Sequence, residues 1–322
     1  MNMIKPDRIP SLKPVTNVRI TTLVDNYSDV FLKNSDHVVR PPMVKEGKRT
    51  SPLLAEHGLS FMVEVWDGQD HHAVIMDFGV SHLAMPHNLS VLGVDPADME
   101  SFVLSHGHHD HVGALKPVLG ALSQPAEVFV HPHAFLEERI HSFSDGSEVP
   151  IPSLKKEDVE AAGSRIIEVT EPTLLAGGYM LTLTEIPRQV DFEKGMPTTY
   201  YKKEGQLYKD HIRDDQGLAI LVRNKGLVVI TGCGHSGIIN TLLYAREITG
   251  IDDIYAVMGG FHLTGPHFEP VIESTVQEMK KFSPEVLVPC HCTGWKAIRA
   301  FETSFPEAFV LNAVGTRVLS CF

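Results

Sequence analysis

Cysteine is scarce in this sequence of 322 residues, with four in the whole chain. Three of them lie between positions 233 and 292, and the last is Cys321. So few cysteines, clustered in the C-terminal third, do not make the disulfide framework of a small secreted protein. We therefore expect reduced thiols and a cytoplasmic protein.

Long apolar runs and an excess of positive charge are also missing. No run nears the length of a membrane helix, and residues 1–6 lack the apolar core of a signal peptide. The formal net charge is −12, and the densest basic stretch is residues 45–49. This balance argues against long phosphate backbones as ligands. We expect a small-molecule substrate and neither nucleic acid nor membrane as a partner, and the sequence leaves a homo-oligomer open.

The composition, with 43% hydrophobic and 21% charged residues, is that of a globular protein able to bury a large core. A single α/β domain over residues 1–322 is the simplest expectation. Short β-like runs alternate with turns in both halves of the chain. These runs are residues 18–24, 60–66, 73–76, 101–104, 126–130, 179–184, 218–222, 227–230, 254–258 and 285–288.

Helical patterns follow several of these runs. Residues 112–122 are expected to form one helix, and an apolar helical period after position 237 stops at Gly250, a good C-cap residue. Another helix is expected over residues 271–282, before Ser-Pro, and a further one from Trp295. Two β-rich halves flanked by helices predict a four-layer α/β sandwich, with the site where strand ends of both halves meet.

Two segments interrupt this alternation and look like insertions, near residues 135–160 and 189–216. The first mixes charge, proline and short apolar groups, and the second is polar with Tyr200, Tyr201 and Tyr208 interspersed. Long segments of this kind serve as lids or dimer contacts, or are ordinary packed surface excursions. The sequence leaves these roles open.

The densest group of metal-binding side chains is the run Ser-His-Gly-His-His-Asp-His that ends at His111. A loop between a strand and a helix can aim His106 and His108 at one zinc, iron or manganese ion. Asp110 and His111 would then reach a second ion beside it, and His109 would point away. Two ions can share a hydroxide nucleophile and polarise the group it attacks, which indicates hydrolysis or group transfer.

Three more histidines follow later strand-like runs through loops, where α/β folds place functional side chains. We expect His235 and His291 to bind metal, and His262 to bind metal or to contact a ligand or the substrate. A helix N-terminus directly after His235 would also favour an anion there. The cysteine spacing is weak for a thiolate zinc site, so we expect Cys233 to pack or to contact a metal ligand more than to bind metal itself.

Upstream, Asp77 lies in Ile-Met-Asp-Phe-Gly, before the histidine-rich run and the later histidines. This arrangement resembles the metallo-β-lactamase superfamily over nearly the whole chain. Within it, several stretches are similar to dihydropterin ribofuranosylaminobenzene phosphate synthases, enzymes of methanopterin assembly, and their bacterial relatives. These stretches are residues 23–26, 56–60, 185–188, 214–215, 231–237, 259–263 and 291–294.

The resemblance implies an αβ/βα sandwich that holds two divalent metal ions at one edge between the sheets, with zinc expected first and manganese or iron also compatible. The implied ligands are His106, His108 and His235 for one ion, and Asp110, His111 and His291 for the other. Asp77 more often orients the metal loop than binds metal. Many superfamily members place a bridging aspartate after the strand of residues 227–230, where this sequence reads Thr-Gly-Cys.

Three functions fit these features. The first is a hydrolase that attacks a small phosphorylated or anionic substrate with a metal-bound hydroxide, Asp110 being among its catalytic residues. The second is a transferase in which an arylamine ribofuranosyl phosphate displaces the diphosphate of a dihydropterin-methyl diphosphate, with Phe261, Tyr200 or Tyr201 stacking on the pterin. The third is a non-catalytic metal- or ligand-binding protein. Candidate substrate contacts, each also compatible with a purely structural role, are Asn26, His57, Arg188 and Phe261.

Overall fold

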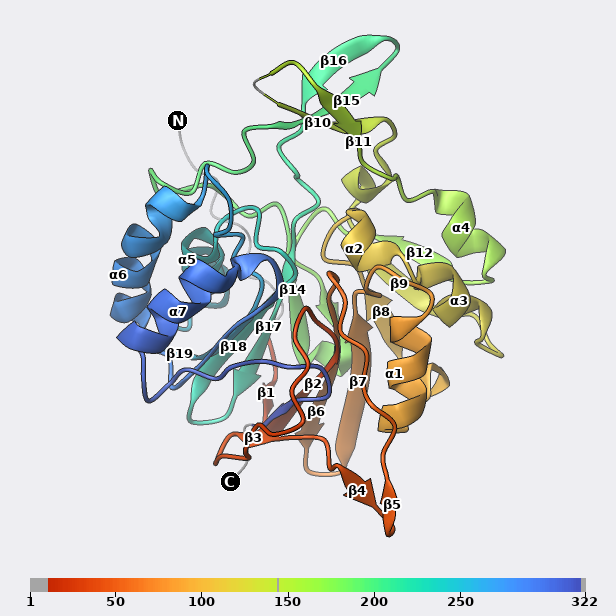
Figure 1. The fold of residues 1–322 in the computed structure, drawn as a ribbon, viewed down its shortest axis with the longest axis vertical. Helices are drawn as coiled ribbons and strands as arrows, with labels where there is room; N and C mark the ends of the chain where they lie inside the picture. Colours follow the sequence, from red (N-terminus) through yellow and green to blue (C-terminus); the bar gives the residue numbers. More distant parts are fainter. Residues whose placement is uncertain (1–10, 144, 320–322) are drawn as a thin grey trace.

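Two large sheets pack face to face, and helices cover the outer face of each (Figure 1). The structure is a computed structural model that describes residues 11–143 and 145–319. Residues 1–6, expected to lack a signal-peptide core, and Cys321, expected to be a reduced thiol, lie outside the described residues. The predicted four-layer α/β sandwich is confirmed.

The first sheet has eight strands and is built mainly from the N-terminal half of the chain. In order across the sheet they are β12 (Arg165–Glu168), β9 (Glu127–Val130), β8 (Ser101–Val103), β7 (Asp70–Met76), β6 (Ser60–Asp67), β2 (Asn17–Val24), β21 (Arg317–Leu319) and β3 (Val38–Val39). The pairs β7–β8, β8–β9 and β9–β12 are parallel. Parallel strands end at the same edge of a sheet, so the loops after β7 and β8 lie together.

The second sheet has seven strands, of which six follow one another across it. In order they are β13 (Leu174–Leu175), β14 (Met180–Leu183), β17 (Gly217–Val222), β18 (Gly226–Thr231), β19 (Ile254–Gly259) and β20 (Val286–Pro289), and β1 (Pro14–Val15) pairs with β17. The strands β18, β19 and β20 are parallel. Their carboxyl ends therefore bring three loops to one edge.

Both faces of the sheets are packed with apolar side chains, because successive residues of a strand point to opposite faces. In β18, Val228 and Ile230 join the core between the sheets, whereas Leu227 and Val229 pack under helices. Successive strand residues point to opposite faces, so a run buried on both faces reads as continuously apolar. This explains why each strand-like run expected from the sequence lies on a strand.

The helices fall into two outer layers, seen on the two sides of Figure 1. One layer holds α5 (Ile238–Thr249), α6 (Ile272–Phe282) and α7 (Trp295–Ser304), and the other holds α1 (Ala84–Leu92), α3 (Leu115–Gly120) and α4 (Lys156–Ala161). Gly250 ends α5 in the left-handed conformation with φ 71°, and Ser283 ends α6 with φ 49°, as the stop signals predicted.

The single helix expected over residues 112–122 is wrong. The structure has the short helix α2 (His109–Val112) and then α3, with a break between them. The Gly113 N–H donates to the Gly79 carbonyl, and the His111 carbonyl accepts the Phe78 N–H. These bonds to the loop after β7 replace the helical bonds that a continuous helix would need at this point.

The two segments that look like insertions meet in one small sheet, at the top of Figure 1. It consists of β11 (Glu148–Pro150), β10 (Arg139–Ser142), β15 (Thr199–Lys203) and β16 (Gln206–Lys209). The antiparallel pair β10–β15 joins the two segments. A further hairpin of β4 (Val44–Lys45) and β5 (Lys48–Arg49) lies at the opposite end. None of the helices in residues 11–143 and 145–319 has the length and apolar character needed to cross a membrane.

Candidate metal centre

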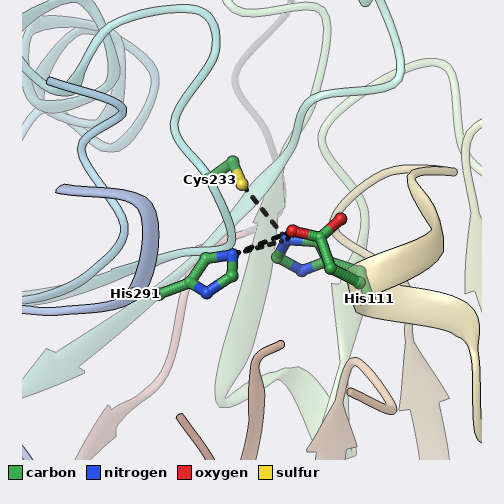
Figure 2. A group of neighbouring side chains, drawn as sticks. His111, Cys233 and His291 are labelled. Atoms are coloured by element: carbon green, nitrogen blue, oxygen red, sulfur yellow. Dashed lines mark hydrogen bonds and ion pairs between the residues drawn. The ribbon is translucent and has the colours of Figure 1, made fainter. Parts of the chain in front are cut away.

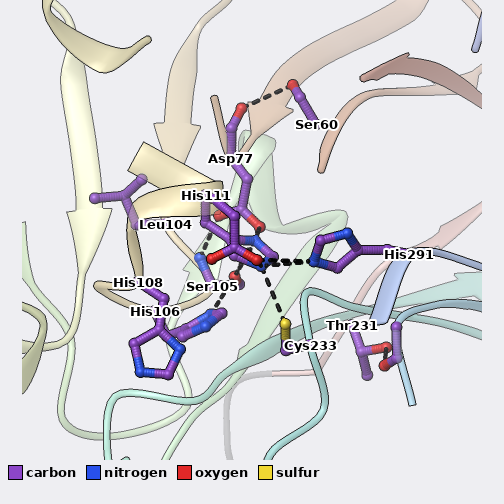
Figure 3. Close-up of polar contacts among 12 residues, drawn as sticks. Ser60, Asp77, Leu104, Ser105, His106, His108, His111, Thr231, Cys233 and His291 are labelled. Carbon is purple, nitrogen blue, oxygen red and sulfur yellow. Dashed lines mark hydrogen bonds and ion pairs between the residues drawn. The ribbon is translucent and has the colours of Figure 1, made fainter. Parts of the chain in front are cut away.

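Asp77, directly after β7, fixes the loop that carries the histidine-rich run (Figure 3). Its buried carboxylate accepts the Ser105 backbone N–H on Oδ1 and the Ser105 hydroxyl on Oδ2, both at 2.7 Å. The same Oδ2 lies 2.7 Å from His111 Nδ1. A carboxylate that engages one ring nitrogen sets the orientation of the ring and leaves the other nitrogen to a metal. The contacts of Asp77 are therefore those of an orienting residue.

Three histidine nitrogens converge on one side of the site. His106 and His108 come from the loop after β8, and His235 comes from the loop after β18. His235 Nε2 lies 3.2 Å from His106 Nε2 and 3.2 Å from His108 Nδ1. Two nitrogens bound to one tetrahedral zinc at their usual bond lengths lie about 3.3 Å apart. Each separation is that of two nitrogens on one ion, with His235 common to both pairs, and all three rings are buried.

The protonation of these three rings also suits a metal. Burial, followed by repulsion from His111, lowers the pKa of His106. Burial, followed by the nearby Arg139 guanidinium, lowers the pKa of His108 to about 3, and burial lowers that of His235 as well. The neutral imidazole is the form that binds metal, so no proton competes for these nitrogens near neutral pH.

His111 and His291 face one another on the other side of the site (Figure 2), and Asp110 belongs to the same group of candidate ligands. His291 follows β20, and its Nε2 lies 3.2 Å from both His111 Nε2 and Asp110 Oδ2. The separation between His111 Nε2 and Asp110 Oδ2 is 3.7 Å. Bonds of about 2.0 to 2.2 Å from one ion reach atoms at these separations. A second ion fits here, beside the first.

The pKa shifts in this second group differ from those of the first three histidines, because carboxylates lie beside His111. Burial alone would lower the pKa of His111, but the Asp77 and Asp110 carboxylates beside it raise it to about 9. Burial opposes ionisation of Asp110, yet His111 and His291 hold the pKa of that carboxyl well below its usual range. The metal-free group therefore holds a proton on His111, which a bound cation would replace.

Cys233 lies between the two groups. Its buried Sγ is 3.1 Å from His111 Nε2. Two sets of ligand atoms, each within 4.8 Å of one another, share this cysteine: Asp110, His111, Cys233 and His291, and His106, Cys233 and His235. Burial raises the pKa of the Cys233 thiol, so the thiol keeps its proton without a metal. The position favours contact with the ligands over the packing role, both of which the sequence left open.

Two adjacent acids in the segment before β17 hold the loops of the first three histidines. Asp214 Oδ2 accepts the Gly107 N–H at 2.8 Å, between two of the ligands. Asp215 Oδ2 accepts the Ser236 N–H at 2.7 Å, directly after His235. Burial raises the pKa of Asp215 to about 6. In the sequence, these two acids were identified only as part of the family resemblance. The local pattern that could have indicated them is a pair of acids shortly before an apolar strand.

Arg139, at the start of β10, balances this buried negative charge. Its Nη2 lies 2.6 Å from Asp214 Oδ1 and its Nε 2.9 Å from Asp210 Oδ2, and the arginine is 1% exposed. Burial opposes ionisation of Asp214, but the guanidinium lowers the pKa of that carboxyl to about 2. Sequence reasoning missed Arg139, because nothing in its local pattern distinguishes a buried arginine from a surface one.

The loop after β2 supports His291 and leads to the open side of the site. Asp25 Oδ1 accepts the His291 N–H at 3.1 Å, and Asn26 Oδ1 lies 3.2 Å from His291 Nδ1. Asn26 Nδ2 lies 3.2 Å from His57 Nδ1, and His57 Nε2 is 3.8 Å from Asp110 Oδ2. The His57 side chain is 70% exposed. Asn26 and His57 thus lie beside the second group, and a substrate contact by either stays a prediction.

Two other candidate substrate contacts are tied into the fold. Arg188 Nη2 donates to the His211 carbonyl at 2.7 Å. Phe261 is 2% exposed, and its ring packs edge-on against Phe301 with centroids 5.5 Å apart. The structure thus gives Arg188 a local hydrogen bond and Phe261 a place in the core, and contacts of either with a substrate stay predictions.

A pocket of about 210 Å³ opens beside His235. Its lining includes Phe192 and Phe268 as apolar surface and Lys194 and His262 as polar groups. The His262 ring centroid lies 4.4 Å from that of His235. The pocket therefore joins the first group of histidines to an apolar surface with basic side chains.

Tyr200 and Tyr201, expected beside a pterin, lie instead on β15 of the small sheet.

Glu193 occupies the helix N-terminus that follows His235. Its carboxylate accepts the Ile239 N–H at 3.0 Å and the Asn240 N–H at 2.8 Å. Burial raises the pKa of Glu193 to about 7. The start of α5 was expected to favour an anion. In the structure the carboxyl group that occupies it is that of Glu193, which lies 46 residues before Ile239 in the sequence. No local pattern near His235 could have indicated it.

The fold and the paired ligand groups define a member of the metallo-β-lactamase superfamily. The structure is similar to the crystal structure of Tm1679, a metal-dependent hydrolase of the beta-lactamase superfamily, with a TM-score of 0.71 and 27% sequence identity. The match covers 94% of this chain and 98% of the other. No family model matches the chain.

In sequence, the chain is 32% identical over 301 residues to the 7,8-dihydropterin-6-methyl-4-(beta-D-ribofuranosyl)-aminobenzene-5'-phosphate synthase of Methanocaldococcus jannaschii, covering 92% of this chain and 94% of that protein. An uncharacterized protein of the same archaeon, MJ0448, is 31% identical over 268 residues, which cover 82% of this chain and 93% of that protein. The chain therefore belongs to the family of this synthase, and the resemblance stated from the sequence is confirmed.

Proposed function

We propose that this protein is a metal-dependent hydrolase that acts on a small phosphorylated or otherwise anionic substrate. The observation that carries the proposal is the convergence of two ligand groups from loops of both sheets. One group has its nitrogens 3.2 Å apart around His235, and the other has its ligand atoms 3.2 Å apart around His291. Such a pair of groups suits a two-metal site.

The chemistry of the donors supports two divalent cations. Imidazole nitrogens and one carboxylate bind zinc well, and they also accept manganese or iron. When bound, two such ions would lower the pKa of water and stabilise charge that develops on the attacked group. Asp110 remains ionised because its pKa is lowered, so it can serve as a metal ligand.

Residues on the open side of the site suit an anionic substrate. His57 Nε2, in an exposed side chain 3.8 Å from Asp110 Oδ2, can donate a hydrogen bond to a phosphate oxygen. In the pocket, Lys194 would attract the negative charge, His262 could form a hydrogen bond, and Phe192 and Phe268 would pack against an apolar part. The proposal places the enzyme in the cytoplasm, where its buried free thiols stay reduced.

Metal content and turnover together test this proposal. Protein purified without added metal is expected to hold about two ions, falling to about one in His291→Ala. His109→Ala is the matched control, since His109 lies in the same run but is exposed, and it is expected to keep both ions. The wild type should hydrolyse a phosphomonoester or phosphodiester in a screen and take up oxygen from labelled water. Two bound ions without turnover of any anionic ester would favour the binding-protein interpretation.

A second candidate function is the transferase reaction of the archaeal relative. The observation that favours it is the 32% identity to that synthase over 94% of its length. In this reaction the arylamine ribofuranosyl phosphate, rather than water, would displace the diphosphate. The test is to supply the dihydropterin-methyl diphosphate with and without the arylamine. Diphosphate released only when both are present would replace hydrolase with transferase, whereas release from the pterin compound alone would support hydrolysis.

A further inference from the structure

Cys233 is placed where both groups of ligands can reach it. It is the second residue after β18, and its Sγ lies 3.1 Å from His111 Nε2 (Figure 2). Its sulfur is also within 4.8 Å of the ligand atoms of His106 and His235. A zinc ion with a Zn–N bond of about 2.05 Å and a Zn–S bond of about 2.3 Å can join atoms up to about 4.3 Å apart. The 3.1 Å separation from His111 Nε2 lies within this limit, and the sulfur belongs to the candidate ligand groups on both sides of the site.

The backbone next to Cys233 and facing it is closely packed. A Cβ on Gly232 would lie 2.1 Å from Ser105 Oγ, and a Cβ on Gly260 would lie 2.5 Å from Cys292 Sγ. The Gly260 N–H donates to the Gly232 carbonyl at 2.8 Å. Gly232 thus lets the loop after β18 approach Ser105 of the histidine loop closely, and Gly260 lets the loop after β19 approach Gly232 and Cys292.

We propose that Cys233, as a thiolate, is the ligand shared by both metal ions, at the position where many superfamily members carry a bridging aspartate. This inference rests on the two-metal site of the proposed function. On binding, the S–H bond breaks, the sulfur uses its lone pairs to bond both ions, and the proton leaves to solvent. A soft sulfur donor makes the site more selective for zinc over magnesium or manganese than a carboxylate would.

A separate Cys–His–Cys site is the competing arrangement. Ligand atoms of Cys233, His262 and Cys292 also lie within 4.8 Å of one another. However, the Cys292 thiol donates to the Cys233 carbonyl at 3.3 Å. A shared thiolate therefore needs Cys233 alone, whereas the competing site needs both cysteines, and the two arrangements make different predictions for Cys292.

X-ray absorption of the zinc-loaded protein counts sulfur neighbours and so separates these cases. A sulfur shared by two ions gives about one sulfur per zinc on average, and a sulfur on one ion gives about half that value. We expect about one sulfur per zinc in the wild type and in Cys292→Ser, and none in Cys233→Ser. Cys290→Ser is the matched control, because Cys290 is equally buried but packs in the core between the sheets. A value near one half, or a loss in Cys292→Ser, would overturn the proposal.

Cobalt substitution gives an independent readout. A thiolate on cobalt produces strong near-ultraviolet charge-transfer absorption, expected in the wild type and in Cys290→Ser and absent from Cys233→Asp. The aspartate variant should still bind about two ions, since it restores the carboxylate usual at this position. Wild-type protein with two ions and no sulfur neighbour would refute only the shared thiolate. Wild-type protein that binds fewer than two ions would refute the two-metal site of the proposed function as well.

Discussion

Replacing Arg139 with methionine is expected to destabilise the fold and loosen the first metal position. The guanidinium lies between the buried carboxylates of Asp210 and Asp214, at 2.9 and 2.6 Å. Because Asp214 has a pKa of about 2 against an ordinary 3.8, its ionised form is stabilised by about 2.5 kcal/mol. This contribution is present above pH 3.8 and is lost as the pH falls toward 2. Removing one partner of such a buried pair costs about 3 to 5 kcal/mol in measured cases.

Urea unfolding at neutral pH and a zinc competition assay measure the two effects. Arg139→Met should lower the free energy of unfolding by about 3 to 5 kcal/mol and weaken zinc binding, since Asp214 would hold the Gly107 N–H less firmly. Lys202→Met is the control, because Lys202 and Glu148 form a half-exposed pair in the same small sheet, worth less than about 1 kcal/mol. Equal losses in the two variants would refute the reasoning.

Three further predictions concern the packing, the titration and the metal dependence of the fold. Gly113→Ala should lower the free energy of unfolding by at least about 2 kcal/mol in thermal or urea unfolding, because its Cβ would lie 1.9 Å from the Val80 carbonyl oxygen. The control Gly120→Ala, whose Cβ would have no atom within 4 Å, should be neutral or slightly stabilising. The pKa of Glu193 is raised from 4.5 to about 7. The free energy of unfolding of the wild type should therefore fall by about 3 kcal/mol relative to that of Glu193→Gln as the pH rises from 4.5 to 7. A difference between the two proteins that does not change with pH would contradict the burial argument. Chelation of the metal should lower stability by about 2.7 kcal/mol relative to protein with free metal at 100 times its dissociation constant, and an unchanged unfolding curve would contradict the ligand groups.

The strands and the central ligand run could be predicted because their signals are local. His106, His108, Asp110 and His111 lie within six positions, so one loop carries them wherever the rest of the chain goes. Strands such as β18 are buried on both faces and read as continuous apolar runs. The stop at Gly250 was also visible, since a left-handed C-cap favours glycine.

The features that were missed depend on contacts between distant parts of the chain. The break between α2 and α3 comes from the Gly113 bond to the loop after β7, which no local period reveals. The small sheet forms only when β10 meets β15, and each strand alone looks like a polar loop. Likewise, Glu193 and Arg139 become significant only through the buried groups they contact.

The bonds made by Arg139, Asp210 and Asp214 limit which segments of this chain can be replaced by those of a relative. The small sheet projects from one end of the molecule in Figure 1, where an exchange of this part alone would look simple. Its base, however, shares a buried ion network with the backbone of the metal loop at Gly107. A chimaera that exchanges residues 139–142 without residues 210–214 would leave a buried charge unpaired. Exchange confined to the exposed turn between β15 and β16 leaves this network intact, and sequence diversity should therefore be tolerated there first.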